Sequence, residues 1–320
     1  MRLPRLSRKS RVASILGRSS TARIEGLSFG LALLPALAAG RFDLLHFINH
    51  ELAFYAKLPK GWLRPPLLFT NGGMFKPSAY SQFDYVHLLN PVDREDALQF
   101  GVSESRVFMI PRGVDVQRFK PVEPEQKQTL RAQYGIPTDA FVVLSVGYLG
   151  EPSHKRMAWV IDEVAASGDD AFLLLVGGQD RTSVRHEAHG QQRLGSRFRM
   201  MSLPHPQMPE AFSIADLFVL GSVKESFGIA NAESMAAGVP VVAHDSPIMR
   251  WVVDGAGSLV NMTEKGRLAE EVRFYRDNRA DLHQRGELGR RRALEHFNLD
   301  RLGAQYIEMY RQCCEPAWRR

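Results

Sequence analysis

Cysteine is scarce in this sequence, and its scarcity excludes several classes of protein. The 320 residues include two cysteines, the adjacent Cys313 and Cys314. Neighbouring thiols near one end of a chain can build neither a disulfide framework nor a metal site with ligand spacing. Their rarity fits a reducing compartment, and we expect a cytoplasmic protein.

Long apolar runs are also absent. The longest candidate, residues 27–40, is shorter than the ~18 residues of a membrane-spanning helix, and it contains Pro35. We expect it to pack against the sheet of a first domain. With 44% hydrophobic and 24% charged residues, the chain has the composition of a globular protein with room for two domains.

Acidic residues are missing from the start of the chain. Residues 1–23 contain seven Lys or Arg and no acid, whereas the rest has 34 basic and 35 acidic residues. The net charge of +6 therefore belongs to this segment, and no aromatic residues interleave with it, so no nucleic-acid partner is expected. A disordered leader and a basic tail in peripheral contact with an anionic membrane are both left open. An organelle transit peptide has no further support.

Motifs for metals and dinucleotides are missing as well. The sequence has no Asp-x-Asp and no cluster of His, Cys and Asp with ligand spacing, so no metal site is predicted. An NAD-linked enzyme would carry Gly-x-Gly-x-x-Gly after a strand and an acid about 20 residues later. Neither VGYLGE at residues 146–151 nor VGGQDR at residues 176–181 fits that pattern.

Predicted strands and helices alternate along the chain, which indicates an α/β fold. The strands expected in a first domain are residues 41–48, 66–70, 83–90 and 106–110. A segment rich in proline and charge then reads as a linker. We expect a leader at 1–23, an N-terminal domain at 24–112, a linker at 113–126, a C-terminal domain at 127–297 and a last helix within 298–320.

The most informative stretch is residues 215–243. It predicts a buried strand, a loop, a helix over residues 229–237 and a second buried strand, with Gly238 as a left-handed cap of the helix. The loop contains Glu225, Ser226, Phe227 and Gly228. Such a unit places its loop and its helix N-terminus at the carboxyl edge of a parallel sheet, where free N–H groups favour anions.

Two glutamates in this stretch are spaced to reach one site. Seven residues separate Glu225 from Glu233, which lies about one turn into the predicted helix. Carboxylates accept hydrogen bonds in pairs, and this suits the vicinal hydroxyls of a sugar or a ribose. Two solvated surface acids are the alternative that the pair alone leaves open.

The pattern E-SFGIANA-E followed by SMAAGVPVVA resembles the donor-binding motif of GT-B glycosyltransferases of the retaining family 4, the glycosyl transferases group 1. The linker, IPRGVDVQRFKP, is similar to that family's linker, and the last helix to one that crosses back to the first domain. The resemblance implies two Rossmann-like domains facing a cleft. It also implies metal-independent, retaining transfer of a sugar from a UDP-, GDP- or ADP-sugar to a glycan, lipid or small-molecule acceptor, with no cofactor.

The resemblance also implies roles for individual residues. Glu225 would contact hydroxyls of the transferred sugar, and Glu233 the ribose of the nucleotide. The amides of Phe227 and Gly228 would hold phosphate oxygens. The donor-binding set so implied is Ser226, Phe227, Gly228, Ile229, Glu233 and Gly147.

Two cations, Lys155 and Arg156, are predicted to begin a helix after the strand at residues 141–149, where positive charge opposes the helix dipole and indicates an anionic partner. A solvated helix end is the other interpretation. The family has the motifs V-G-R-L and K-G here. Lys155 matches the diphosphate-binding lysine of the second motif, and Arg156 takes the place of its glycine. Tyr148 takes the place of the arginine of the first motif. We expect Arg156 to replace the missing cation, because a guanidinium can hold two phosphate oxygens. With Glu225, these two form the predicted catalytic set.

The acceptor side is less defined. The candidates to contact an acceptor or the donor sugar are His46, His50, Asn71 and Gly72, and structural roles for the histidines are the alternative. Asp245 and Ser246 either line the site or are turn residues. The family opens with a strand and a Gly-rich loop that are not found before residue 41. We therefore expect a shortened N-terminal domain. The expected role is that of an enzyme of cell-surface polysaccharide synthesis. A non-catalytic nucleotide-sugar-binding or scaffolding protein is the alternative.

Overall fold

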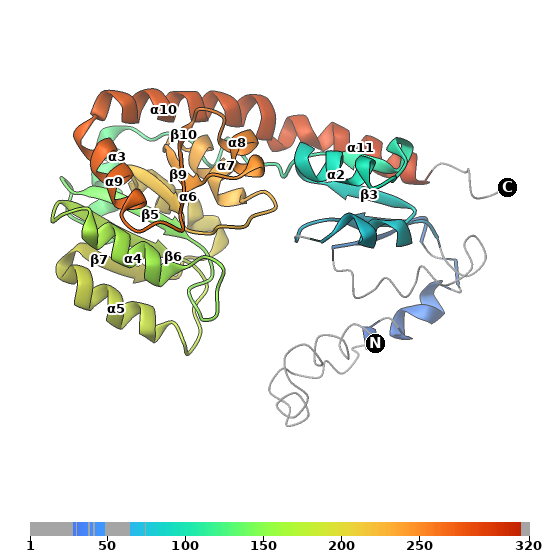
Figure 1. The fold of residues 1–320 in the computed structure, drawn as a ribbon, viewed down its shortest axis with the longest axis horizontal. Coiled ribbons are helices and arrows are strands. Elements are labelled where there is room, and N and C mark those ends of the chain that lie inside the picture. The colour runs from blue at the N-terminus through green and yellow to red at the C-terminus, as the bar shows by residue number, and fades with distance from the viewer. Residues whose placement is uncertain are drawn as a thin grey trace. The chain divides into compact units, whose positions relative to one another are not determined.

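The computed structural model describes residues 28–29, 31–37, 39–40, 42–48, 65–73 and 75–314. The chain divides into two compact units, Met1–Ile110 with Gln305–Arg320, and Pro111–Ala304. Each unit is built around a parallel sheet (Figure 1), which confirms the predicted α/β fold. The basic segment at residues 1–23 and the candidate His50 lie outside the described residues.

The first unit contains a four-stranded parallel sheet in the order β1-β2-β3-β4. Its strands are β1 (Leu45–Phe47), β2 (Leu67–Thr70), β3 (Tyr85–Leu88) and β4 (Val107–Met109). The 3₁₀ helices η2 (Pro77–Gln82) and η3 (Glu104–Arg106) and helix α2 (Pro91–Gln99) connect them. Helix α2 begins where the Asn90 side chain accepts a hydrogen bond from the Asp93 amide and Pro91 takes the first helical position. The rings of Phe69 and Phe83 stack at 4.6 Å in the core below the sheet.

The second unit contains a six-stranded parallel sheet in the order β10-β9-β8-β5-β6-β7. Its strands are β5 (Phe141–Val146), β6 (Ala171–Val176), β7 (Phe198–Met201), β8 (Leu217–Leu220), β9 (Val241–His244) and β10 (Gly257–Val260). Every residue of β6 and β8 is buried. Strands covered on both faces are apolar throughout rather than alternating, and this is why these segments are recognisable as continuous apolar runs.

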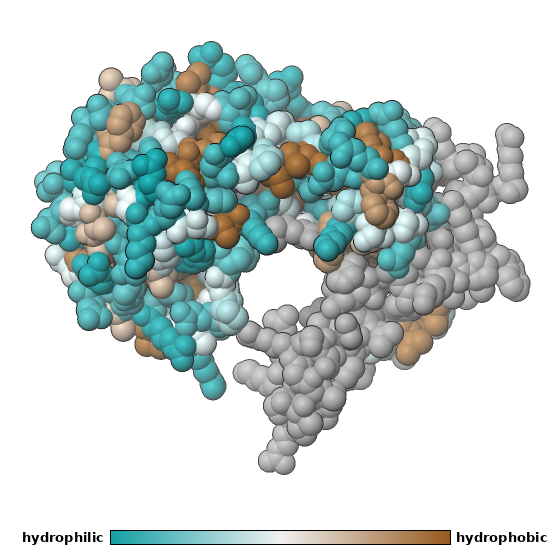
Figure 2. Space-filling view, in the orientation of Figure 1, coloured by the Kyte–Doolittle hydropathy of each residue, from teal (hydrophilic) through white to brown (hydrophobic). Residues whose placement is uncertain are grey.

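Helices cover both faces of this second sheet. The helices are α3 (Pro124–Gln133), α4 (Met157–Ala166), α5 (Val184–Leu194), α6 (Met208–Ile214), α7 (Ile229–Ala236), α8 (Pro247–Val253), α9 (Arg267–Asp277) and α10 (Arg279–Arg292). Short turns η4 (Gly195–Arg197), η5 (His205–Gln207) and the π-helical η6 (Ala293–Phe297) complete it. Helix α4 packs against α5 and α9, and α7 packs against α10. The surface of this unit in Figure 2 is mostly hydrophilic, with scattered apolar residues.

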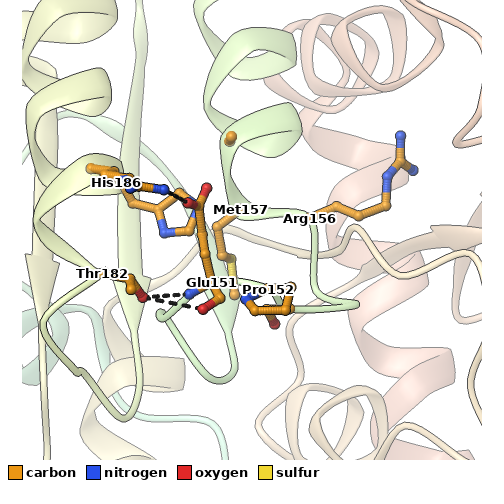
Figure 3. A pocket seen from close by; sticks show the side chains of 9 residues that line it. Glu151, Pro152, Arg156, Met157, Thr182 and His186 are labelled. Atoms are coloured by element: carbon orange, nitrogen blue, oxygen red, sulfur yellow. Dashed lines mark hydrogen bonds and ion pairs between the residues drawn. The ribbon is translucent and has the colours of Figure 1, made fainter. Parts of the chain in front are cut away.

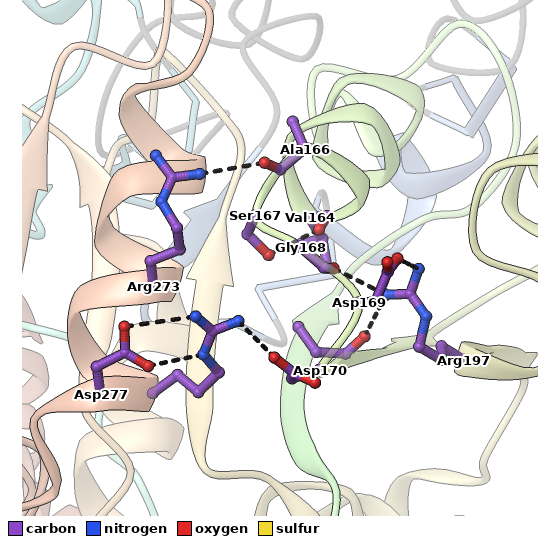
Figure 4. Close-up of polar contacts among 11 residues, drawn as sticks. Val164, Ala166, Ser167, Gly168, Asp169, Asp170, Arg197, Arg273 and Asp277 are labelled. Carbon is purple, nitrogen blue, oxygen red and sulfur yellow. Dashed lines mark hydrogen bonds and ion pairs between the residues drawn. The ribbon is translucent and has the colours of Figure 1, made fainter.

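Arginines hold the carboxyl end of α4, where positive charge complements the helix dipole (Figure 4). Arg273 donates to the Ala166 carbonyl at 3.1 Å. Arg197 donates to the Gly168 carbonyl and to Asp169, each at 3.0 Å. The end of α4 that faces away from the loop carrying Lys155 is therefore fixed.

The last helix, α11 (Leu299–Cys314), starts after a short bridge to the linker. The Val114 amide donates to the Phe297 carbonyl at 2.7 Å, and the Leu299 amide donates to the Val114 carbonyl at 3.0 Å. From Gln305 onward the helix belongs to the first unit, where Tyr306 packs edge-on against His87 with ring centroids 5.2 Å apart. No helix in the described part of the chain combines the length and apolar character needed to cross a bilayer.

Candidate functional site

Two predicted site residues meet at the carboxyl end of the central strands of the second unit. Strands β5 and β8 are neighbours there, although they are far apart in sequence, and ligands of open α/β sheets bind at such switch points. The loop after β5 carries Lys155, and the loop after β8 carries Glu225. The Lys155 Nζ lies 2.5 Å from Glu225 Oε1. The Lys155 and Glu225 side chains are only 18% and 11% exposed, which excludes the solvated surface acid as an interpretation of Glu225.

Gly228 shapes the start of α7, the helix that follows Glu225. It adopts φ 70° and ψ 66°, a left-handed conformation that favours glycine. An added Cβ would also meet Asn231 Nδ2 at 2.8 Å. The Phe227 ring is buried and packs edge-on against Phe297 at 5.3 Å. The aromatic ring thus anchors the loop from the core side, and the backbone presents the N-terminus of α7, which begins at Ile229.

Glu233 lies one turn into α7, as predicted. Burial raises the pKa of its carboxyl group to about 7, against the opposing effect of Arg118. The Arg118 guanidinium donates to the carbonyls of His205 and Pro206 at 3.4 and 3.2 Å, which ties the linker to η5. The carboxyl group of Glu233 therefore changes charge near neutral pH, as a group at a binding site often does.

Arg156 has a different position from the predicted one. Helix α4 begins at Met157, after the two cations that were predicted to begin it, because Arg156 adopts φ 53° and ψ 44°. Its guanidinium donates to the Met262 carbonyl at 2.7 Å and to the Gly221 carbonyl at 3.3 Å. It also lies 4.4 Å from the centroid of the Trp159 ring. These hydrogen bonds allow Arg156 to brace the two loops of the site, and its contact with phosphate stays a prediction.

The family's residue at position 156 already indicated the left-handed backbone found there. Arg156 stands where the related sequences have glycine, and glycine is the residue that most readily adopts a left-handed backbone. The chain keeps that backbone with an arginine in it. A side chain at this position points where the left-handed turn directs it, and here this is onto two backbone carbonyls.

Tyr148, which takes the place of the family's arginine, is also hydrogen-bonded within the protein. Its hydroxyl donates to Asp180 Oδ2 at 2.5 Å across the ends of β5 and β6. Hydrogen bonds from Thr182 and Tyr148 lower the pKa of Asp180 to about 2, so its carboxylate stays ionised. Tyr148 therefore supplies no positive charge to the site, and its hydroxyl already has an acceptor.

A family model described as Glycosyl transferases group 1 matches residues 126–292, just over half of the chain. The chain belongs to this family. Alpha-maltose-1-phosphate synthase of Mycolicibacterium smegmatis is 28% identical over 299 residues, which are 86% of this chain and 76% of that protein. Mannosylfructose-phosphate synthase of Agrobacterium fabrum is 30% identical over 178 residues, which are 51% of this chain and 38% of that protein.

Solved structures agree on the fold. Sucrose-phosphate synthase from Thermosynechococcus elongatus superposes with a TM-score of 0.79 at 24% identity, covering 92% of this chain and 79% of that one. HepE of Anabaena in complex with UDP-glucose has a TM-score of 0.75 at 20% identity, covering 89% and 81%. These likenesses confirm the GT-B fold, and with the family match they establish that this chain is a glycosyltransferase.

Sequence reasoning missed one residue of the glycosyltransferase's charged cluster, His154. Its Nε2 lies 3.6 Å from Glu225 Oε1, the oxygen that Lys155 contacts. The His154 side chain is 65% exposed. Its place directly before Lys155 was the available signal.

A pocket of ≈ 470 Å³, which no sequence pattern predicted, is lined by residues of the loop that carries Lys155 and by residues of α4 and α5 (Figure 3). Glu151 and His186 both line it and lie next to each other, with Glu151 Oε1 and His186 Nε2 3.5 Å apart. Thr182 Oγ1 accepts a hydrogen bond from the Glu151 amide at 2.6 Å. The pocket wall therefore combines polar side chains with the apolar Pro152, Met157 and Ala158, and the Glu151 amide ties the loop between Gly147 and Lys155 to Thr182.

The acceptor-side candidates of the first unit have structural partners. Asn71 is completely buried and donates to the Tyr80 hydroxyl at 2.7 Å, while its carbonyl oxygen accepts from the Phe75 amide at 3.4 Å. Asn71 is therefore hydrogen-bonded inside the first unit, and its contact with an acceptor stays a prediction. The Gly72 amide donates to the Thr70 carbonyl at 2.9 Å and closes the turn after β2.

His46 belongs to a chain of hydrogen bonds across the carboxyl ends of β1, β2 and β3. His87 Nε2 lies 2.8 Å from the Ile110 carbonyl, which can only accept, so this nitrogen donates. Neutral His87 then accepts from Thr70 Oγ1 at 2.8 Å, and Thr70 accepts from His46 Nε2 at 2.6 Å. His46 Nδ1 accepts from the Tyr310 hydroxyl at 2.9 Å. Both ring nitrogens of His46 are thus engaged within the first unit.

The remaining candidates behave as turn residues. Ser246 Oγ accepts from the Met249 amide at 3.3 Å and caps α8, and Asp245 pairs with Arg250 at 2.6 Å. Among the described residues, no group of three or more His, Cys, Asp and Glu side chains is arranged to hold a metal ion.

Proposed function

We propose that this glycosyltransferase moves a sugar, with retention of anomeric configuration and without a divalent metal, from a nucleoside diphosphate sugar to an acceptor. The observation that carries the proposal is the Lys155–Glu225 pair, 2.5 Å apart beside the N-terminus of α7. It combines a cation for phosphate, a carboxylate for sugar hydroxyls and a helix N-terminus for an anion.

Different residues of the site would bind different parts of the donor. Lys155 and the backbone amides of Phe227 and Gly228 would bind the diphosphate, with Ser226 and Gly147 beside them. Glu225 would accept hydrogen bonds from hydroxyls of the transferred sugar. Glu233 would accept from the two hydroxyls of the ribose. In the absence of donor, Glu225 keeps Lys155 in place, and the arriving phosphates compete with Glu225 for that ammonium group.

Charge stabilisation accounts for the chemistry. The bond from the anomeric carbon to the phosphate oxygen breaks, and the acceptor oxygen forms the new bond on the same face. The acceptor proton passes to the leaving phosphate. Lys155 and the N-terminus of α7 would stabilise the negative charge that develops on the departing diphosphate, which lowers the barrier most in a site that excludes water. No step requires a side chain of the first unit as a base.

HepE was solved with UDP-glucose, so UDP-glucose is the first donor to test. Thermal-shift assays with UDP-, GDP- and ADP-glucose should show one base preferred, and release of the nucleotide should persist in EDTA. Glu225→Gln should abolish transfer, whereas Glu270→Gln, an exposed acid on α9 paired with Arg267, should leave it unchanged. Loss of transfer in EDTA, or full activity of Glu225→Gln, would contradict the proposal.

A non-catalytic nucleotide-sugar-binding protein is the second candidate. The observation that favours it is that Asn71 and His46 are already hydrogen-bonded within the first unit. This alternative predicts tight UDP-glucose binding with neither transfer nor slow hydrolysis of the donor. Incubating the protein with UDP-glucose and following released UDP separates the two: release above the rate of the Glu225→Gln variant supports the enzyme. We also propose that the protein works in the cytoplasm.

A further inference from the structure

The cations that surround the proposed diphosphate site are fewer than the sequence suggests. Tyr148 carries no charge and is held by Asp180. Arg156 donates to two backbone carbonyls and lies against Trp159. Lys155 is paired with Glu225, so these two charges cancel. A neutral pair attracts a diphosphate weakly, because the Coulomb attraction of the lysine is offset by the nearby carboxylate.

His154 is the next cationic side chain in this cluster. Its Nε2 lies 3.6 Å from Glu225 Oε1, so Lys155 and His154 approach one and the same carboxylate oxygen. Because the imidazole is 65% exposed, it can rotate toward a ligand without breaking a buried contact. When His154 is protonated, the cluster of His154, Lys155 and Glu225 carries one net positive charge.

We propose that His154 is a donor-binding residue that supplies the second positive charge of the diphosphate site. Its charge stays beside Glu225 as Lys155 turns to the phosphates, so the lysine is released to the ligand without leaving this largely buried carboxylate unpaired. The inference rests on the proposed function of the site and adds to it a histidine, the residue type whose side chain can carry a positive charge close to neutral pH.

Other charged groups must be separated from this effect. Glu225 lies 3.6 Å from His154, and Lys155 contacts the same carboxylate oxygen. Burial raises the pKa of Glu233, which has Arg118 near it, to about 7, so Glu233 also changes charge between pH 6 and pH 8, but on the proposed ribose end of the ligand. Uridine contains the ribose and the base without phosphates. The ratio of the affinities for UDP-glucose and uridine therefore cancels Glu233 and reports on the diphosphate and the glucose, the parts of the donor next to Lys155, Glu225 and His154. UDP-glucose is preferable to UDP, because a terminal phosphate has its own pKa near 6.

The test is calorimetric titration of UDP-glucose and uridine at pH 6 and pH 8. His154→Gln should weaken UDP-glucose about tenfold at pH 6 and leave uridine unchanged, as expected for loss of one charge-assisted contact. His154→Lys should restore the affinity and remove the pH dependence of the ratio. The matched control is His189→Gln, a histidine of α5 that pairs with Asp162 at 3.0 Å.

Two outcomes count against the inference in distinguishable ways. If His154→Gln keeps the wild-type ratio at both pH values while the wild type binds UDP-glucose, His154 is not a donor-binding residue and the proposed function stands. If the wild type binds none of UDP-, GDP- and ADP-glucose, the proposed function and the role of His154 both fail.

Discussion

Single side chains determine the charge of the donor site, and Glu233 gives it a pH dependence. Burial raises the pKa of this carboxyl group to about 7 in the folded protein. The ionised form accepts hydrogen bonds from the two ribose hydroxyls more strongly than the neutral form, because both of its oxygens are charged acceptors. The neutral form dominates below that pKa, so binding should strengthen as the pH rises through 7.

This predicted increase of affinity with pH can be measured with uridine alone. The ionised fraction rises from about one tenth at pH 6 to about nine tenths at pH 8, so uridine affinity should increase by close to the same factor, roughly ninefold. Glu233→Gln should bind weakly and equally at both pH values. The control is Glu287→Gln on α10. A uridine affinity that does not change between pH 6 and pH 8 in the wild type would exclude Glu233 from the ribose contact.

Arg156 was predicted to bind phosphate, and the structure offers a way to decide between that role and bracing. Arg156→Gly removes the guanidinium and keeps the left-handed backbone, which costs a non-glycine residue about 1–2 kcal/mol. If Arg156 braces the loops through Gly221 and Met262, UDP-glucose affinity should stay within about threefold, because relief of backbone strain offsets lost hydrogen bonds.

Direct phosphate binding by Arg156 predicts a different result. Affinity for UDP-glucose would then fall by tenfold or more while affinity for uridine stayed constant. Calorimetry of both ligands with the Arg156→Gly variant measures this directly. Arg193→Gly, an exposed arginine on α5, controls for a general effect of glycine in the domain.

At the scale of elements, a buried ion cluster holds α3 against the central strands. Asp216, directly before β8, pairs with Lys127 and Arg131 of α3, both at 2.7 Å. Burial disfavours the ionised carboxylate, yet the two cations hold the pKa of Asp216 below its usual range. The Val142 amide also donates to Asp216 at 2.8 Å, which links α3 to β5.

Asp216→Ala should therefore destabilise the second unit strongly. It would leave Lys127 and Arg131 without their carboxylate, and breaking a buried pair in this way costs about 3–5 kcal/mol. Urea unfolding followed by circular dichroism measures the loss. Asp162→Ala, on an exposed pair of α4 and α5, should cost below about 1 kcal/mol. Equal losses in the two variants would show that the cluster contributes no more than a surface pair.

The sequence was informative where local chemistry determines local structure. The strand, loop and helix around Glu225 are as predicted, and Gly238 has φ 73°, the left-handed cap expected of it. Apolar runs predicted the strands, although β5 ends at Val146 rather than Leu149. Contacts between distant segments were not predictable, because nothing in the neighbourhood of Arg156 indicates that its guanidinium meets Met262.

Side-chain roles in the first unit were harder to predict for the same reason. Asn71 was placed correctly after its strand, but its burial against Tyr80 depends on η2, which lies further along the chain. The hydrogen-bond chain through His46 and Thr70 ends on Tyr310, 264 residues away from His46. Residue spacing carries no information about partners at such separations.

For the whole molecule, the assignment to the glycosyl transferases group 1 rests on the second unit, which contains residues 126–292. The proposed donor residues all lie in that unit, so donor recognition can be tested without reference to the first. The first unit contributes a four-stranded sheet and the end of α11. Acceptor choice is the property that we expect to depend on it.

The most direct measurement is a double-mutant cycle on UDP-glucose binding with Lys155→Met, Glu225→Gln and the double variant. If the 2.5 Å pair is part of the donor site, each single variant should weaken binding at least tenfold, and the double variant should lose less than the sum of the two free energies. Wild-type affinity in both single variants would contradict the account.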